Sequence, residues 1–144
     1  MDRQDWLLLA LDFAGGQTLS PAQLQKSLFL LGQELPETLG TPDFYQFIPY
    51  NYGPWCRQIY DDAESLASVG LVAVLREPGA SYVQYAITVR GRERGANLRA
   101  LANARGVSYL ERIVAWVLRQ SFSQLVRAIY QKYPEFRQNS VFQE

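Results

Sequence analysis

The sequence predicts a mainly α-helical fold that carries one small β-hairpin. Two observations predict this class: apolar residues recur at helical spacing along most of the chain, and two short β-type runs flank a turn at residues 77–81. The chain has 144 residues, of which 48% are hydrophobic and 19% are charged. These values are typical of one globular unit with its own core, so we predict a single domain over residues 1–144.

The first helix is expected at residues 5–13, where the side chains are apolar on nearly every side. A helix that is hydrophobic all round is a buried helix. Gly15 and Gly16 follow it, and glycine is the usual residue just past a helix end. We therefore expect the first helix to be buried.

The second helix begins at a strong start signal, Ser20 followed by Pro21. Serine can cap a helix N-terminus, and proline fits the first helical position. Leucines then recur at helical spacing and predict a helix to about Glu34; they are Leu24, Leu28, Leu31 and Leu35. A proline and a glycine within residues 35–41 predict that a loop follows.

A third helix is expected to begin at Gly53-Pro54, with the proline in its first position, and to end at Gly70. One apolar face is predicted for it, formed by Trp55, Ile59, Leu66 and Val69. Adjacent side chains on a helix point in different directions and do not converge on one metal ion. The acids of this helix are therefore interpreted as a solvated face; they are Asp61, Asp62 and Glu64.

A β-hairpin is predicted where residues 71–75 and 82–88 flank the turn. An arginine-rich helix follows, from Thr88 or Arg90 to about residue 103, and Gly106 is expected to break the chain there.

Two more helices are expected after this break. Ser108 is expected to cap a helix over residues 109–119, and Ser121 or Ser123 to cap the last one. Pro134 is expected to end that last helix.

The order helix, helix, helix, hairpin and further helices is the outline of a winged helix. In such a fold the second helix supports the third, and the hairpin is the wing. The second and third helices are separated by roughly twenty residues, too many for the tight turn of a simple helix-turn-helix. We predict a winged-helix core over about residues 5–89 and a helical extension over about residues 90–144.

The titratable residues give little support to catalysis. The chain has no histidine, which removes the commonest general base near neutral pH and any Ser-His-Asp or Cys-His arrangement. Cys56 is the only cysteine and is expected in the first turn of the third helix, as a small apolar packing residue more than as a reactive thiol. A phosphate-binding glycine loop is also absent from the sequence. We predict a protein that is not an enzyme and has no cofactor or metal site.

The formal net charge is zero, but the charges are divided unevenly along the chain. Residues 1–70 hold nine acids and three bases, and residues 71–144 hold five acids and eleven bases, a net charge of −6 against +6. Three interpretations stay open: an acidic partner or nucleic acid for the basic half, attraction between the halves within a monomer or a homodimer, or ordinary alternation of charged faces.

Arginines on and after the predicted wing are candidates for a binding patch. They could contact phosphates, dock an acidic protein, or form an ordinary solvated surface. The third helix itself matches a polyanion poorly because it carries more acids than bases. The candidate partner- or nucleic-acid-binding residues are Arg57, Arg76, Arg90, Arg92, Arg94 and Arg99.

An aromatic corner precedes the third helix, where five of the fourteen residues at 47–60 carry rings. Its central residues are Tyr50, Tyr52 and Trp55. The favoured interpretation is a packed corner that fixes the loop on the second and third helices. The alternative is an exposed patch for a protein partner, because tyrosine and tryptophan are frequent anchors at interfaces.

The sequence does not predict a membrane protein. Its longest apolar run, residues 6–11, is far shorter than the roughly 20 residues of a membrane span. The first residues are acidic and polar, unlike the basic opening of a signal peptide. We expect a cytoplasmic protein.

Four segments of the chain resemble the Panacea, or SocA-like, antitoxin domain: LQKSLFLL at 24–31, FIPYNYGPW at 47–55, LASVGLV at 66–72 and YAITVRG at 85–91. The chain is similar also, and more closely, to a related group of uncharacterised prokaryotic winged-helix proteins, whose tail looks like residues 130–140. The resemblance covers most of the chain. It departs at Cys56, where such domains often carry serine or threonine.

The resemblance implies a winged-helix module without catalysis. In antitoxin members the domain neutralises a toxin by protein contact, and some relatives are expected to regulate transcription. We therefore expect a non-enzymatic module that acts through a protein partner, antitoxin-like or defence-associated. The alternative is a winged-helix transcriptional regulator that contacts DNA through its wing and the following arginines.

Overall fold

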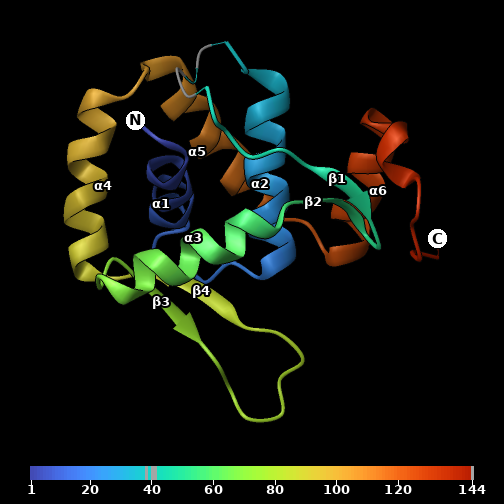
Figure 1. Ribbon diagram of the computed structural model, residues 1–144, viewed down its shortest axis with the longest axis horizontal. Helices are drawn as coiled ribbons and strands as arrows, with labels where there is room; N and C mark the ends of the chain where they lie inside the picture. Colours follow the sequence, from blue (N-terminus) through green and yellow to red (C-terminus); the bar gives the residue numbers. More distant parts are fainter. Residues whose placement is uncertain (38, 40–41, 144) are drawn as a thin grey trace.

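The computed structural model describes residues 1–37, 39 and 42–143 (Figure 1). Within these residues the chain forms six α-helices, one 3-10 helix and two separate antiparallel strand pairs. The elements are α1 (Arg3–Phe13), α2 (Pro21–Glu34), β1 (Ile48–Tyr50), β2 (Gly53–Trp55), α3 (Arg57–Ser68), β3 (Val72–Leu75), β4 (Gln84–Ile87), α4 (Val89–Leu101), α5 (Ala104–Leu118), α6 (Phe122–Lys132) and the 3-10 helix η1 (Pro134–Arg137). The predicted class, mainly helical with a small hairpin, is confirmed; the pair β1–β2 has no counterpart in the prediction.

Helix α1 lies at the centre of the molecule, enclosed by α2, α3, α4, α5 and β4 (Figure 1). Residues 6–11 are each at most 1% exposed, which confirms the expectation of a buried helix. Asp2 caps α1, and Asp2 and Asp5 exchange hydrogen bonds between side chain and backbone. This buried helix provides the surface on which most other elements pack.

Helix α2 begins as predicted. Ser20 caps it and exchanges hydrogen bonds with Gln23, and Pro21 occupies the first position. The predicted leucine face is buried and packs on α1 and α5. The loop predicted over residues 35–41 includes positions 38, 40 and 41, which lie outside the described residues.

The predicted helix start at Gly53-Pro54 is wrong, because these residues begin strand β2, which pairs with β1 in a tight hairpin. Gly53 has a φ of +108°, far from the roughly −63° of an α-helix. The turn between the strands consists of Asn51 and Tyr52. The third helix begins only at Arg57.

The sequence predicts Cys56 in the first turn of the third helix. This prediction is wrong, because Cys56 is the residue before α3. It occupies the N-cap position but makes no side-chain capping bond. The buried side chain of Gln25, on α2, donates to the Cys56 carbonyl and accepts from the Cys56 N–H, each at 2.8 Å. One amide of α2 therefore fixes the backbone between the β1–β2 hairpin and α3.

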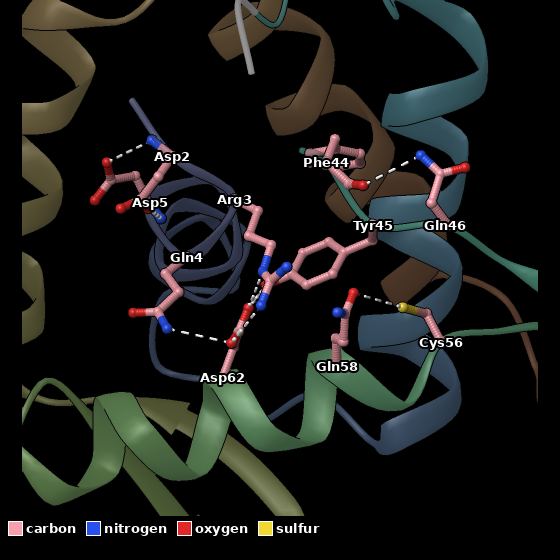
Figure 2. A network of polar contacts seen from close by, with 10 residues as sticks. All are labelled: Asp2, Arg3, Gln4, Asp5, Phe44, Tyr45, Gln46, Cys56, Gln58 and Asp62. Carbon is pink, nitrogen blue, oxygen red and sulfur yellow. Dashed lines mark hydrogen bonds and ion pairs between the residues drawn. The ribbon is translucent and has the colours of Figure 1, made fainter. Parts of the chain in front are cut away.

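Asp62 corrects the prediction of a solvated acidic face on α3. It is 4% exposed and lies among side chains of α1 and of the segment before β1 (Figure 2). Its carboxylate accepts hydrogen bonds from Tyr45 Oη (2.6 Å), Arg3 Nε (2.8 Å) and Gln4 Nε2 (3.2 Å). Burial raises the pKa of Tyr45, and the hydrogen bond to Asp62 raises it further. Three donors allow this carboxylate to be buried.

The apolar face predicted for the third helix is confirmed only in its central part. Ile59 and Leu66 are buried on α3. Trp55 belongs to β2, and Val69 is the C-cap residue and is 53% exposed. Both lie outside the helix because it is shorter than predicted at each end.

The predicted hairpin is confirmed as β3–β4, with Val72 opposite Ile87 and Leu75 opposite Gln84. Its tip projects away from the helices (Figure 1). Leu19 and β4 residue Tyr85 exchange two backbone hydrogen bonds of 2.9 Å. The hairpin is thus attached to the chain segment between α1 and α2.

Helices α4 and α6 begin where the sequence predicts, after the caps Thr88 and Ser121. The expected break at Gly106 is wrong, because this residue lies inside α5. That helix is capped by Asn103 and not by Ser108. A Cβ at position 106 would lie 2.8 Å from the ring of Trp6, so the glycine permits close packing of α5 on α1.

The C-terminal segment folds back over the β1–β2 hairpin. Pro134 follows α6 and begins η1. Beyond it, the Val141 N–H donates to the Asn51 carbonyl at 2.9 Å, and Tyr130 Oη donates to Ser140 Oγ at 2.6 Å. Of the helices that the structure describes, none combines the length and apolarity of a membrane span.

The Asp62 network gives a testable stability difference. Asp62→Ala should lower the free energy of unfolding by roughly 2–3 kcal/mol, because Tyr45 and Arg3 lose their acceptor. Asp61→Ala is the matched control, since Asp61 is exposed on the same helix, and it should change stability by less than about 0.5 kcal/mol. Urea unfolding followed by tryptophan fluorescence measures both; equal effects of the two substitutions would contradict the structural role.

Candidate binding groove

An open groove of about 950 Å³ lies between α2, the β1–β2 hairpin, the start of α6 and the β3–β4 hairpin. The first half of α2 forms part of its wall together with Gly53, Pro54 and Trp55 of β2. The opposite parts come from Ser121 and Phe122 at the start of α6, and from Ser81, Tyr82 and Gln84 of the β3–β4 hairpin. The volume falls in the range of roughly 300–1,000 Å³ that is usual for ligand sites.

Four aromatic side chains at this groove are between 45% and 56% exposed; they are Tyr50, Tyr52, Tyr82 and Phe122. Ring contacts hold three of them in place. Tyr50 stacks on Trp55 with ring centroids 4.9 Å apart, and Tyr52 meets Phe122 edge-on at 5.2 Å. The groove therefore has an accessible aromatic rim, and ring contacts fix three of its four side chains.

The aromatic corner predicted from the sequence forms one part of this rim. Trp55 is half-buried and contacts both Tyr50 and Tyr60, as expected of a packed corner. Tyr50 and Tyr52 remain accessible at the hairpin turn, as expected of an exposed patch. The two interpretations that the sequence left open describe different residues of the same hairpin.

Lys26 lines the groove and is 3% exposed. Within the described part of the chain, no carboxylate or other acceptor bonds to its ammonium group. The aliphatic part of the Lys26 side chain lies next to the β1–β2 hairpin: a Cβ built at Gly53 would lie 3.8 Å from Lys26 Cε. Burial lowers the pKa of Lys26 to about 8, since removing a charge from water disfavours its ionised form.

This burial destabilises the fold at neutral pH. The pKa falls from 10.5 to about 8, and each unit corresponds to about 1.4 kcal/mol, so the cost is about 3 kcal/mol when the amine is protonated. The other lysine, Lys132, is exposed and pairs with Glu34. That pairing raises the pKa of Lys132 and lowers the pKa of Glu34.

The candidate arginines of α4 lie away from the groove. Three of them contact α1 or the turn after it: Arg92 donates a hydrogen bond to the carbonyl of Gly15 (2.9 Å), and Arg94 and Arg99 form ion pairs with Asp5 (3.7 Å) and Asp12 (3.4 Å). Because α1 belongs to the acidic half of the chain and α4 to the basic half, these contacts join the two halves within one molecule.

The other candidate arginines are dispersed. Arg76, directly after β3, pairs with Glu64 of α3, and the Arg90 guanidinium lies against Gly70. Arg57 is exposed at the start of α3 and has no ion pair among residues 1–37, 39 and 42–143. The structure does not bring the six arginines together on one surface.

The thiol that the sequence analysis considered is buried. Cys56 is 5% exposed, and its sulfur lies 4.0 Å from Gln58 Oε1 (Figure 2). Among the described residues, no group of three or more cysteines and acids is arranged to hold a metal ion. The chain matches none of the protein-family models, and no curated protein sequence matches it significantly.

Two residues that matter most for the groove were not singled out from the sequence. Gln25 and Lys26 follow Leu24 within α2, at positions that an amphipathic pattern assigns to solvent. Both are buried because the β1–β2 hairpin folds over this face of α2. Their burial could have been predicted only if the β1–β2 hairpin had been predicted from the sequence.

The pKa of Lys26 predicts how stability should change with pH. Lys26→Met should raise the free energy of unfolding at pH 7 by about 2–3 kcal/mol. Below pH 8 the Lys26 amine is protonated in both the folded and the unfolded wild-type chain, and burying this charge destabilises the folded chain. As pH rises above 8 the folded amine loses its proton first, so the difference should shrink by roughly 2 kcal/mol by pH 9.5.

Urea unfolding at several pH values measures this difference. Lys132→Met is the matched control: its exposed ion pair should contribute less than about 1 kcal/mol, without change between pH 7 and pH 9.5. A Lys26→Met variant that is less stable than wild type at pH 7 would contradict the assignment of a buried, unpaired ammonium.

Proposed function

We propose that the protein is a non-enzymatic winged-helix module that binds a protein partner, antitoxin-like or defence-associated, and that the groove receives a segment of this partner. The observation that carries the proposal is the accessible aromatic rim. Tyr50, Tyr52, Tyr82 and Phe122 are each close to half exposed at one groove. Aromatic anchors beside a concave surface are characteristic of protein interfaces.

The order of elements supports a winged-helix core within this proposal. Helices α1, α2 and α3 are followed directly by the projecting β3–β4 hairpin. The hairpin is joined to α3 by packing and to Leu19 by backbone hydrogen bonds. In this arrangement the hairpin is the wing and also one wall of the groove.

A non-enzymatic role is supported by the chemistry of the groove. Lys26 is the only charged side chain among the described residues that line it. The described lining residues include no aspartate, glutamate or cysteine that could form a catalytic pair with its amine. The buried sulfur of Cys56 is not among the lining residues of the groove.

Regulation of transcription through DNA contact, the alternative, has less support. Arg94 and Arg99 form ion pairs with acids of α1, so their charges are partly neutralised within the fold, and Arg92 donates to the Gly15 carbonyl. These contacts also explain part of the uneven charge division without a homodimer. A cytoplasmic location, within reach of either partner, belongs to the same proposal.

Substitution at the rim tests the proposed function. After a partner has been identified by co-purification from the source cells, Tyr52→Ser and Phe122→Ser should each weaken its binding at least tenfold, because anchor side chains contribute about 1.4 kcal/mol or more. Isothermal titration calorimetry measures the affinity.

The matched control is Leu101→Ser, which removes an apolar side chain that is 77% exposed on α4, away from the groove; its affinity should be unchanged. Arg57→Glu tests an interface based on the arginines. Partner binding that is lost in Arg57→Glu and retained in both rim variants would overturn the assignment to the groove. A mobility-shift titration tests the alternative, binding to DNA. Sequence-specific DNA binding that weakens steeply as the salt concentration rises would favour a transcriptional regulator.

A further inference from the structure

Lys26 is buried at a cost to stability, and its side chain lines the open groove. Buried ammonium groups in proteins are normally paired with an acid or hydrogen-bonded. Lys26 has neither within the described residues, although its side chain lines an open groove. An anion entering the groove would supply the missing partner.

The rest of the lining favours a negative charge. The described lining residues include no aspartate or glutamate, so no side-chain charge in the groove repels an anion; the C-terminal end of α5 borders the groove as well, through Leu118. Their polar members are amides and hydroxyls, among them Gln25 and Gln120. The N-termini of α2 and α6 also border the groove through Pro21 and Phe122, and the positive ends of helix dipoles favour anions.

The number of positive charges in the groove favours a carboxylate over a phosphate group. Lys26 is one cation, and no arginine is present among the described lining residues. Phosphate groups are usually held by several donors, often with arginine, whereas one ammonium balances the single charge of a carboxylate. The aromatic rings around the rim suit apolar groups next to that carboxylate.

We propose that Lys26 is the anchor for a carboxylate of the partner protein, carried by a segment whose neighbouring apolar side chains contact the aromatic rim. This inference rests on the proposed function, since it assigns the chemistry of the partner at the same groove. The carboxylate belongs either to the chain terminus of the partner or to an aspartate or glutamate side chain. In both cases it bonds to the Lys26 ammonium and compensates its burial.

The first experiment tests the carboxylate without a partner. The probe is 3-phenylpropionate, and its neutral isostere 3-phenylpropionamide is the control ligand. In protein labelled with ¹³C-lysine only two lysines contribute signals, Lys26 and Lys132. The acid should shift the Lys26 signal saturably and leave Lys132 unchanged, with at least tenfold tighter binding than the amide.

The matched variants are Lys26→Met and Lys132→Met. Binding of 3-phenylpropionate, followed through the tryptophan side-chain signals, should weaken at least tenfold in Lys26→Met and stay unchanged in Lys132→Met. Equal binding of acid and amide, or equal binding by wild type and Lys26→Met, would overturn the inference. Because Lys26→Met is expected to be more stable than wild type, loss of binding cannot be assigned to unfolding.

The second experiment identifies the source of the carboxylate. A peptide selected against the full chain from a random display library is synthesised with a free or amidated C-terminus, and with its acidic residues changed to amides. A tenfold loss on amidation supports a terminal carboxylate, and a tenfold loss on Glu→Gln or Asp→Asn supports a side chain. Two further outcomes distinguish the proposals. If a peptide loses affinity in the Tyr52→Ser variant but binds equally well in its free, amidated and acid-to-amide forms, the proposed function stands and the carboxylate anchor is contradicted.

If 3-phenylpropionate binds at Lys26 but every selected peptide binds away from the groove, the carboxylate site stands and the protein-partner function is contradicted.

Discussion

A helix that is apolar on all sides must be covered on all sides, and this constraint on α1 organises the fold. Residues 6–11 of α1 are buried by α2, α3, α4, α5 and β4. No single neighbour can cover this surface, so elements from both halves of the chain are required. The C-terminal helices α4 and α5 are therefore part of the core, and the chain packs as one unit around α1 (Figure 1).

This packing decides how the charged residues are used. The cover of α1 by α4 brings arginines of one half against acids of the other, as in the Arg99–Asp12 pair. The same approach explains the glycine at position 95, where a Cβ would lie 2.6 Å from the Asp12 carboxylate. The division of charge along the sequence thus corresponds in part to attraction within one chain. In Figure 1 the β1–β2 hairpin and α6, which carry Tyr50, Tyr52 and Phe122, lie on the far side of α2 from α4, so the ion pairs of α4 and these rings lie on separate parts of the fold.

Local signals predicted the elements that depend on local interactions. The caps Ser20, Thr88 and Ser121 and the β3–β4 turn are visible in the sequence because neighbouring residues determine them. The start at Gly53-Pro54 was misread because a Gly-Pro pair also suits a strand after a tight turn, and only the pairing of Tyr50 with Gly53 distinguishes the two. Gly106 was misread as a helix break because the contact that requires a glycine there is with the ring of Trp6, a hundred residues away in sequence. The groove depends on such distant contacts throughout, so of its residues only the aromatic corner was predicted.

Asp62 and Lys26, two charged residues that the fold buries, are compensated differently. Asp62 has three donors around its carboxylate, supplied by α1 and by Tyr45, so its burial is compensated within the chain. Lys26 is buried to the same degree but has no such acceptor among the described residues. A charge compensated within the fold stabilises one arrangement of its elements. A charge left uncompensated beside an open groove lowers stability and gains a partner only when an anion enters. The difference between these two residues is therefore what connects the fold to the proposed function.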